Sequence, residues 1–106
     1  MTDNPLLDTL RSFVTERDWG QFHTPANLAM SISIEAAELL QCFQWGISAP
    51  DERIKEELAD VMTYCLLLAD RLGVSMEALV LEKLATTREK YPVDKARGRS
   101  TRYDAL

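Results

Sequence analysis

Residues 25–44 read PANLAMSISIEAAELLQCFQ, and residues 51–72 read DERIKEELADVMTYCLLLADRL. In both stretches apolar residues recur at the three- and four-residue spacing of an amphipathic α-helix, and proline or acidic residues occupy the first turn, where helices favour them. Each helix would be about 30 Å long at 1.5 Å per residue. The short linker between the two stretches predicts that these helices lie antiparallel and pack face to face.

Two further helices are predicted outside this pair. Asn4-Pro5 is typical of an N-cap followed by a first-turn proline, and helical spacing then continues to about Asp18. Ser75 is the expected N-cap of the last helix, which ends near Tyr91-Pro92. Residues 93–106 form a polar C-terminal tail without a clear period. The sequence therefore predicts an all-α, four-helix bundle in a single domain over residues 1–106.

Composition agrees with helices and excludes several classes of protein. The chain has 15 Leu and 11 Ala against 5 Val and 4 Ile, a ratio that favours helix over sheet. A net charge of −5 argues against binding to duplex nucleic acid. No apolar run approaches the ~20 residues of a membrane helix, and the N-terminus lacks the basic region of a signal peptide. We therefore expect a cytoplasmic protein in which Cys42 and Cys65 are free thiols.

Each long helix carries two carboxylates three residues apart, one of which points toward the core. On a helical wheel Glu35 falls in the middle of an apolar stripe, and Glu38 lies about 60° away. In the next helix Glu57 lies at the edge of the stripe, with Asp60 about 60° further round. Burying a carboxylate is costly unless it has a partner, and neither stripe contains a cation.

Three interpretations of these four acidic residues remain open from spacing alone. Hard divalent cations take oxygen ligands, and helical bundles build such sites from i, i+3 pairs on facing helices. The favoured interpretation is therefore a metal site for Mg²⁺, with Mn²⁺ as an alternative, formed by Glu35, Glu38, Glu57 and Asp60. Salt bridges between helices are the second interpretation, and a misaligned wheel is the third.

The last helix adds a cation to this arrangement. Lys83 falls within its apolar stripe, with Thr87 and Lys90 alongside. A lysine in such a position often lays its stem over apolar surface and extends its ammonium group into water. Beside an acidic metal site, the same ammonium group would instead hold a phosphate or pair with the carboxylates.

Aromatic residues are concentrated near the helix ends. Trp19 and His23 occupy the first loop, and Trp45 comes one residue before Gly46. Tryptophans in such positions usually fill gaps in a core, and a lone loop histidine is usually a surface residue. Next to a metal and a phosphate, however, flat aromatic faces and a polar ring edge suit a nucleobase.

These residues together resemble a known family. Glu35-Ala-Ala-Glu38, eighteen residues and Glu57-Leu-Ala-Asp60 resemble the E-x-x-E…E-x-x-D signature of the MazG-like, all-α NTP pyrophosphohydrolases. Three flanking strings resemble the dCTP pyrophosphatase branch of that family: RDWGQFH at residues 17–23, FQW at 43–45 and KYPV at 90–93. The likeness extends from about Leu6 to Leu106.

The resemblance implies a homo-oligomer, a tetramer built as a dimer of dimers or at least a dimer, and Mg²⁺-dependent hydrolysis of a nucleoside triphosphate to a monophosphate and pyrophosphate. It implies a preference for dCTP or a related pyrimidine deoxynucleotide and a role in nucleotide-pool sanitation. Glu35 or Glu38 would be the catalytic base. The residues implied to bind substrate are Trp19, His23, Trp45, Tyr64, Lys83, Thr87 and Lys90.

Two positions depart from the family pattern. Thr87 stands where close relatives usually carry Asn, and Leu10 stands where vertebrate relatives carry His. Both changes are expected to weaken discrimination between bases. Hydrolysis of another nucleotide, such as dUTP or phosphoribosyl-ATP, is the alternative within the superfamily. A helical interaction module without catalysis is the alternative outside it.

Overall fold

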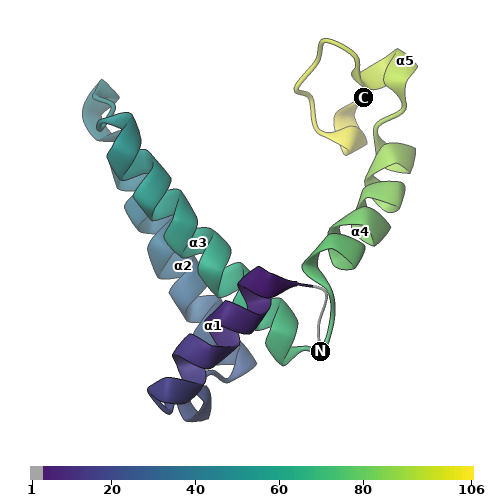
Figure 1. Cartoon of the computed structure of the whole chain (residues 1–106). Helices are drawn as coiled ribbons and strands as arrows, with labels where there is room; N and C mark the ends of the chain where they lie inside the picture. The colour runs from purple at the N-terminus through teal and green to yellow at the C-terminus, as the bar shows by residue number, and fades with distance from the viewer. Residues whose placement is uncertain (1–3) are drawn as a thin grey trace. The chain divides into compact units, whose positions relative to one another are not determined.

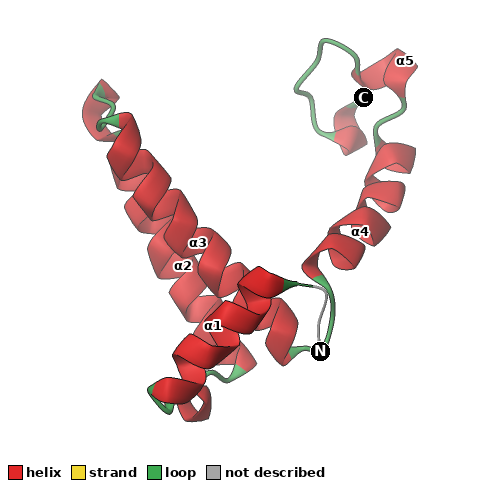
Figure 2. Ribbon diagram, viewed as in Figure 1, coloured by secondary structure: helices red, strands yellow, loops and turns green. Residues whose placement is uncertain are grey.

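The structure is a computed structural model that describes residues 4–106, and within this range it contains helices and loops but no β-strand (Figure 1, Figure 2). The chain divides into two compact units, of which the first runs to Val74 and the second covers Ser75–Leu106. The all-α prediction is confirmed, and each of the four predicted helices is present. No helix among the described residues combines the length and the apolar character needed to cross a membrane.

The first unit is built on a pair of long helices. Its elements are α1 (Pro5–Glu16), the 3₁₀ turn η1 (Trp19–Phe22), α2 (Pro25–Gln41), the 3₁₀ turn η2 (Gln44–Gly46) and α3 (Asp51–Arg71). Helices α2 and α3 lie side by side, as predicted, and α1 lies against α3 and η1 (Figure 1).

The ends of these helices follow local chemistry that the sequence predicts. The Asn4 side chain accepts a hydrogen bond from the Leu7 amide at 3.1 Å, and the Thr24 hydroxyl accepts one from the Asn27 amide at 3.1 Å. Both are N-caps that satisfy amides left free in a first turn. Helix α3 ends where Gly73 adopts a positive φ of 72°, a conformation that costs glycine little.

Two helices end earlier than predicted. Helix α1 stops at Glu16 because Asp18 turns into the left-handed region, with a φ of 52°. Helix α2 stops at Gln41 instead of Gln44. The Cys42 carbonyl there accepts a hydrogen bond from the Ala49 amide at 2.6 Å, and Trp45 turns to a φ of 63°. The loop that follows α2 thus closes before the apolar spacing of the sequence ends, and the helix is shorter than this spacing predicts.

The core of the first unit is small. Its buried hydrophobic side chains, counted over residues 4–74, are Leu28, Cys42, Leu66 and Ala69. Helical spacing on residues 51–72 predicts an apolar stripe of Ile54, Leu58, Val61, Cys65, Leu68 and Leu72. This prediction is partly wrong, because Leu58 and Leu72 are exposed while Leu66 and Ala69 are buried. Helix α3 packs against α1 as well as α2, so its buried face differs from the one that a two-helix wheel selects.

The second unit contains α4 (Met76–Lys90), a short helix α5 (Val93–Ala96) and a 3₁₀ turn η3 (Tyr103–Ala105). The tail is therefore not irregular throughout. The Tyr91 hydroxyl accepts a hydrogen bond from the Tyr103 amide at 3.2 Å, and the two rings meet edge to face at 6.0 Å. These contacts between aromatic residues give the tail an order that polar composition alone does not predict.

Candidate active site

Three carboxylates converge where α2 and α3 face each other. Glu35 comes from α2, and Glu57 and Asp60 come from α3. One oxygen of each lies within 4.8 Å of the others. The i, i+3 spacing on α3 puts both of its acids on the side that faces α2. A single cation can contact all three groups.

Glu38, one helical turn after Glu35, belongs to the same cluster. Burial raises the pKa of Glu35 to about 6, and the Glu38 carboxyl adds to the rise through a hydrogen bond to the protonated form and through charge repulsion. Burial also raises the pKa of Glu57, and Glu38 again contributes. All four predicted acidic residues are therefore close enough to influence one another.

The cluster suits a metal ion better than salt bridges. Within residues 4–106 none of the four carboxylates forms an ion pair with a lysine or arginine, although the charge of Arg53 slightly lowers the pKa of Glu57. Glu35 Oε2 and Glu57 Oε2 are covered and lack a hydrogen-bond partner in this part of the chain. Covered oxygens without a donor are unfavourable unless a cation contacts them.

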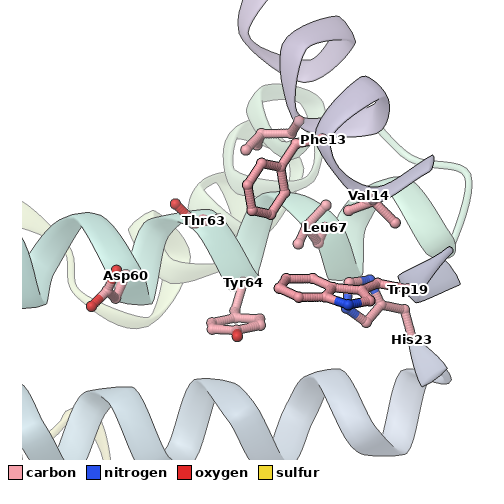
Figure 3. A pocket seen from close by; sticks show the side chains of 9 residues that line it. Phe13, Val14, Trp19, His23, Asp60, Thr63, Tyr64 and Leu67 are labelled. Atoms are coloured by element: carbon pink, nitrogen blue, oxygen red, sulfur yellow. The ribbon is translucent and has the colours of Figure 1, made fainter. Parts of the chain in front are cut away.

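A cavity of about 270 Å³ opens next to the acidic cluster. Figure 3 shows side chains reaching into it from α1, from η1 and the residue after it, and from α3. The lining residues are Leu10, Phe13, Val14, Trp19, His23, Asp60, Thr63, Tyr64 and Leu67. The cavity is thus mainly apolar and aromatic, with a few polar groups, as is usual for sites that bind small molecules.

The aromatic wall of this cavity is held by contacts among its own members. The Phe13 and Trp19 rings meet edge to face with centroids 5.5 Å apart. The Arg17 guanidinium lies 3.8 Å from the Phe13 ring centroid and donates a hydrogen bond to the Phe13 carbonyl at 3.0 Å. The sequence analysis missed Phe13 as a site residue, because its helical spacing is the same as that of a core residue.

Asp60 belongs to both the acidic cluster and the cavity. The structure thereby brings Trp19, His23 and Tyr64 into one cavity that adjoins the carboxylates. Thr63 and Leu67 were also not predicted as site residues. The one feature of the sequence that could have indicated them is their place on the same helix, Thr63 one turn and Leu67 two turns after Asp60. A ligand with an apolar ring at one end and an anionic group at the other matches this arrangement.

Other predicted substrate residues lie elsewhere in the chain. Trp45 is 91% exposed in η2, at the opposite end of α2 from Trp19, roughly 25 Å away at 1.5 Å per residue. Lys83, Thr87 and Lys90 belong to the second unit. There the Thr87 hydroxyl donates a hydrogen bond to the Lys83 carbonyl at 3.1 Å, and the Lys90 ammonium lies 4.6 Å from the centre of the Tyr103 ring. Roles for these four residues in substrate binding remain predictions.

Comparison with known proteins identifies the family. A profile of the MazG-like family matches residues 30–106. This chain belongs to the MazG-like family. The dCTP pyrophosphatase 1 of Rattus norvegicus is 39% identical over 116 residues, covering 96% of this chain and 68% of the relative. The protein of the same name from Homo sapiens is 38% identical with the same coverage.

A solved structure supports the same assignment for this MazG-like chain. A pyrophosphatase from Archaeoglobus fulgidus superposes with a TM-score of 0.75 at 44% sequence identity, over 82% of this chain and 89% of the other. The family resemblance inferred from the acidic signature is thereby confirmed, as is the all-α fold of the family.

Proposed function

We propose that this chain is a metal-dependent pyrophosphohydrolase that cleaves a nucleoside triphosphate into the monophosphate and pyrophosphate, with dCTP or a related pyrimidine deoxynucleotide preferred. The observation that carries the proposal is the position of Asp60, which lines the aromatic cavity and belongs to the acidic cluster. A nucleotide has a flat ring at one end and phosphates at the other, and the site offers a matching place for each. The names of the vertebrate relatives support both the reaction and the base.

The acidic cluster would take the phosphate end with the help of a metal. Glu35, Glu57 and Asp60 would hold Mg²⁺, or Mn²⁺ in its place, with Glu38 completing the set. When bound, such an ion neutralises phosphate oxygens and lowers the pKa of a water molecule. Four carboxylates without a cation would repel a triphosphate, so substrate binding also depends on the ion.

The reaction needs one proton acceptor from the protein. The oxygen of a water molecule forms a bond to the α-phosphorus, and the bond from that phosphorus to the oxygen bridging the β-phosphate breaks. Pyrophosphate leaves with the electrons of the broken bond. Glu35 or Glu38 would accept the proton of the attacking water, since both are the carboxylates that α2 contributes to the cluster.

The aromatic cavity would take the base. Trp19 and Tyr64 offer flat ring faces, and His23 offers a polar edge. Stacking contributes about 1–3 kcal/mol but accepts any base. Discrimination must come from hydrogen bonds, where an unpaired buried group costs about 1–3 kcal/mol, or roughly 10- to 100-fold in rate. Leu10 places an apolar side chain in the cavity, so we expect a graded preference rather than strict selection.

A panel of nucleotides tests this proposal. Pyrophosphate release is measured with Mg²⁺ for dCTP, dTTP, dUTP, dATP, CTP and phosphoribosyl-ATP, and kcat/KM values are compared. We expect dCTP to rank first and pyrimidine deoxynucleotides to rank above dATP. A purine preferred tenfold over dCTP would overturn the base assignment. Release of pyrophosphate from none of them would overturn the reaction.

The small core supports a homo-oligomer, and a tetramer follows the family resemblance. Apolar side chains on α2 are exposed in the isolated chain, among them Met30, Ile34 and Leu40. A monomer that leaves several large apolar side chains of one helix exposed is expected to cover them by association. We propose that the assembled enzyme acts on nucleotide pools in the cytoplasm, where two free cysteines are stable.

A further inference from the structure

A charged pair joins α1 to α3 beside the cavity. The Arg11 Nε donates to Asp70 Oδ1 at 3.2 Å and to Asp70 Oδ2 at 3.0 Å, and Arg11 Nη2 donates to Oδ1 as well. The Arg11–Asp70 pair is thus bidentate, the geometry in which arginine and carboxylate bind most strongly and with the most defined orientation. The hydrogen bond from Arg11 holds the pKa of Asp70 below its usual value, so the pair is charged at neutral pH.

The pair lies next to the base cavity without lining it. Arg11 and Asp70 line a second cavity of about 230 Å³. Val14, His23 and Leu67 line both cavities, so the two cavities adjoin. Arg11 follows Leu10 on α1, and Asp70 lies one turn after Leu67 on α3. The pair accordingly connects the two helices that form opposite walls of the base cavity.

Apolar packing holds α1 only weakly. None of the side chains of α1, which is described over its whole length, is buried. Phe13 is half-exposed, and its ring contact is with Trp19, which belongs to the turn that directly follows α1 and not to α3. The bidentate Arg11–Asp70 contact is a directed polar link from α1 to the long helix α3, in addition to this half-exposed apolar packing.

We propose that the Arg11–Asp70 pair positions the α1 wall of the base cavity, and thereby the affinity of the enzyme for the base end of its substrate. Neither residue touches the reacting atoms, so both are positioning residues. The proposal rests on the proposed function in taking the cavity as the base site. The positions of Leu10, Phe13 and Val14, which line the cavity, would then depend on a contact made by Arg11, which lies within three residues of each of them on α1.

The test compares Asp70→Asn and Arg11→Met with the wild-type enzyme. We expect KM for dCTP to rise about threefold to tenfold in each variant while kcat stays within about twofold, because the reacting end is untouched. Inhibition by dCMP, which carries the base, should weaken in parallel. Inhibition by inorganic pyrophosphate, which has no base, should not change. The exchanged pair Arg11→Asp/Asp70→Arg should recover most of the loss.

A control variant and a measurement without substrate complete the design. Lys55→Met breaks the exposed Lys55–Glu52 contact of 3.5 Å within α3 and should leave all constants unchanged. Hydrogen exchange of the amides of α1 (residues 5–16, of which Pro5 has no N–H) should accelerate at least threefold in the Arg11 and Asp70 variants and return toward wild type in the exchanged pair. Arg11→Lys, which keeps the charge but loses the planar fork, should be intermediate.

Unchanged KM and dCMP inhibition in both single variants would overturn the proposal. So would an equal loss of kcat and of pyrophosphate inhibition, since that pattern marks a general loss of structure. If the wild-type chain released pyrophosphate from no nucleotide, the proposed function would fail separately. The exchange rates of residues 5–16 would then still decide whether the pair positions α1.

Discussion

At the scale of single residues, Glu35 shows how the fold changes the chemistry of an ordinary side chain. Burial and three neighbouring acids, Glu38, Asp60 and Glu57, raise its pKa from an ordinary 4.5 to about 6. One of its oxygens is covered and lacks a hydrogen-bond donor among residues 4–106. Such a group destabilises the metal-free fold, and a divalent cation removes that cost.

Replacing single members of the cluster should abolish most activity and keep the fold. Glu38→Gln and Asp60→Asn preserve shape and remove one charge each. We expect kcat/KM to fall on the order of 100-fold or more. Mutating residues that only hydrogen-bond to a metal ligand already lowers metal affinity or activity about 10- to 100-fold. Glu56→Gln, on an exposed neighbour, is the matched control. Turnover near wild type in a folded Glu38 or Asp60 variant would remove that residue from the ligand set.

The raised pKa of Glu35 predicts how the metal-free protein responds to pH. The folded state binds this proton more tightly than the unfolded state, so the stabilisation is complete below about pH 4.5 and is lost as pH rises through about 6. In EDTA, the Tm should therefore decrease as the pH is raised from about 4.5 to about 6. Asp70 affects stability in another pH range. Because its pKa is lowered in the folded state, its stabilisation is complete above the usual value of 3.8 and is lost only as the pH falls below that value.

Calorimetry of Glu35→Gln isolates this effect. The variant has no proton to release at that position, so its Tm should change less between pH 4.5 and 6 than that of the wild type. Some dependence should persist, because the pKa of Glu57 is also raised. A pH profile identical to that of the wild type would show that Glu35 does not control stability in this range.

At the scale of elements, the α2–α3 pair carries the acidic cluster. Facing i, i+3 pairs on two helices bring four like charges together, which opposes the packing of the same helices. A cation that binds only the folded state stabilises it by about 2.7 kcal/mol at 100 times its dissociation constant. The metal site and the helix pairing are therefore coupled.

Millimolar Mg²⁺ should accordingly raise the Tm of the wild-type protein. Scanning calorimetry with MgCl₂ is compared with NaCl of the same ionic strength, which separates binding from charge screening. The double variant Glu57→Gln/Asp60→Asn should respond much less, because α3 then supplies no carboxylate to the site. An equal response to both salts in the wild type would contradict a specific metal site.

At the scale of the whole molecule, the chain has more apolar surface than it can bury alone. Its buried hydrophobic side chains within residues 4–106 are Leu28, Cys42, Leu66 and Ala69. Helix α4 has no buried residue, and its Leu79, Val80 and Leu81 are exposed. Domains of this size often obtain the missing burial by oligomerisation.

Light scattering at micromolar concentration should therefore give a mass two or four times that of the 12.0 kDa chain, with four expected. The reason is the apolar surface left exposed on α2 and α4, which a second copy would cover. Dilution should reduce activity if the assembly completes the site. A stable particle of the chain mass would contradict the proposal.

Trp45 offers a related test at this scale. It is almost fully exposed and lies far from the base cavity of its own chain. Trp45→Ala should weaken the binding of every nucleotide together if the ring is a stacking platform, because stacking does not select among bases. A change confined to one base would show instead that Trp45 reads the base.

The helices and the acidic signature could be predicted from the order of the residues alone. Helical spacing, the N-caps at Asn4, Thr24 and Ser75 and the i, i+3 carboxylates are local patterns, and local patterns can be read from a single chain. The pairing of residues 25–44 with 51–72 followed from a short linker. The resemblance to the MazG-like family rested on the same short motifs and was confirmed by comparison.

Which residues contact one another across the fold became clear from the packing of the helices. The packing of α1 on α3 shifted the buried face to Leu66 and Ala69 and joined Arg11 to Asp70 across 59 positions. No local pattern specifies such contacts, because they depend on how three helices share one surface. The same geometry made Asp60 common to the acidic cluster and the base cavity. The sequence shows which side chains can do the chemistry, and packing brings them within reach of one another.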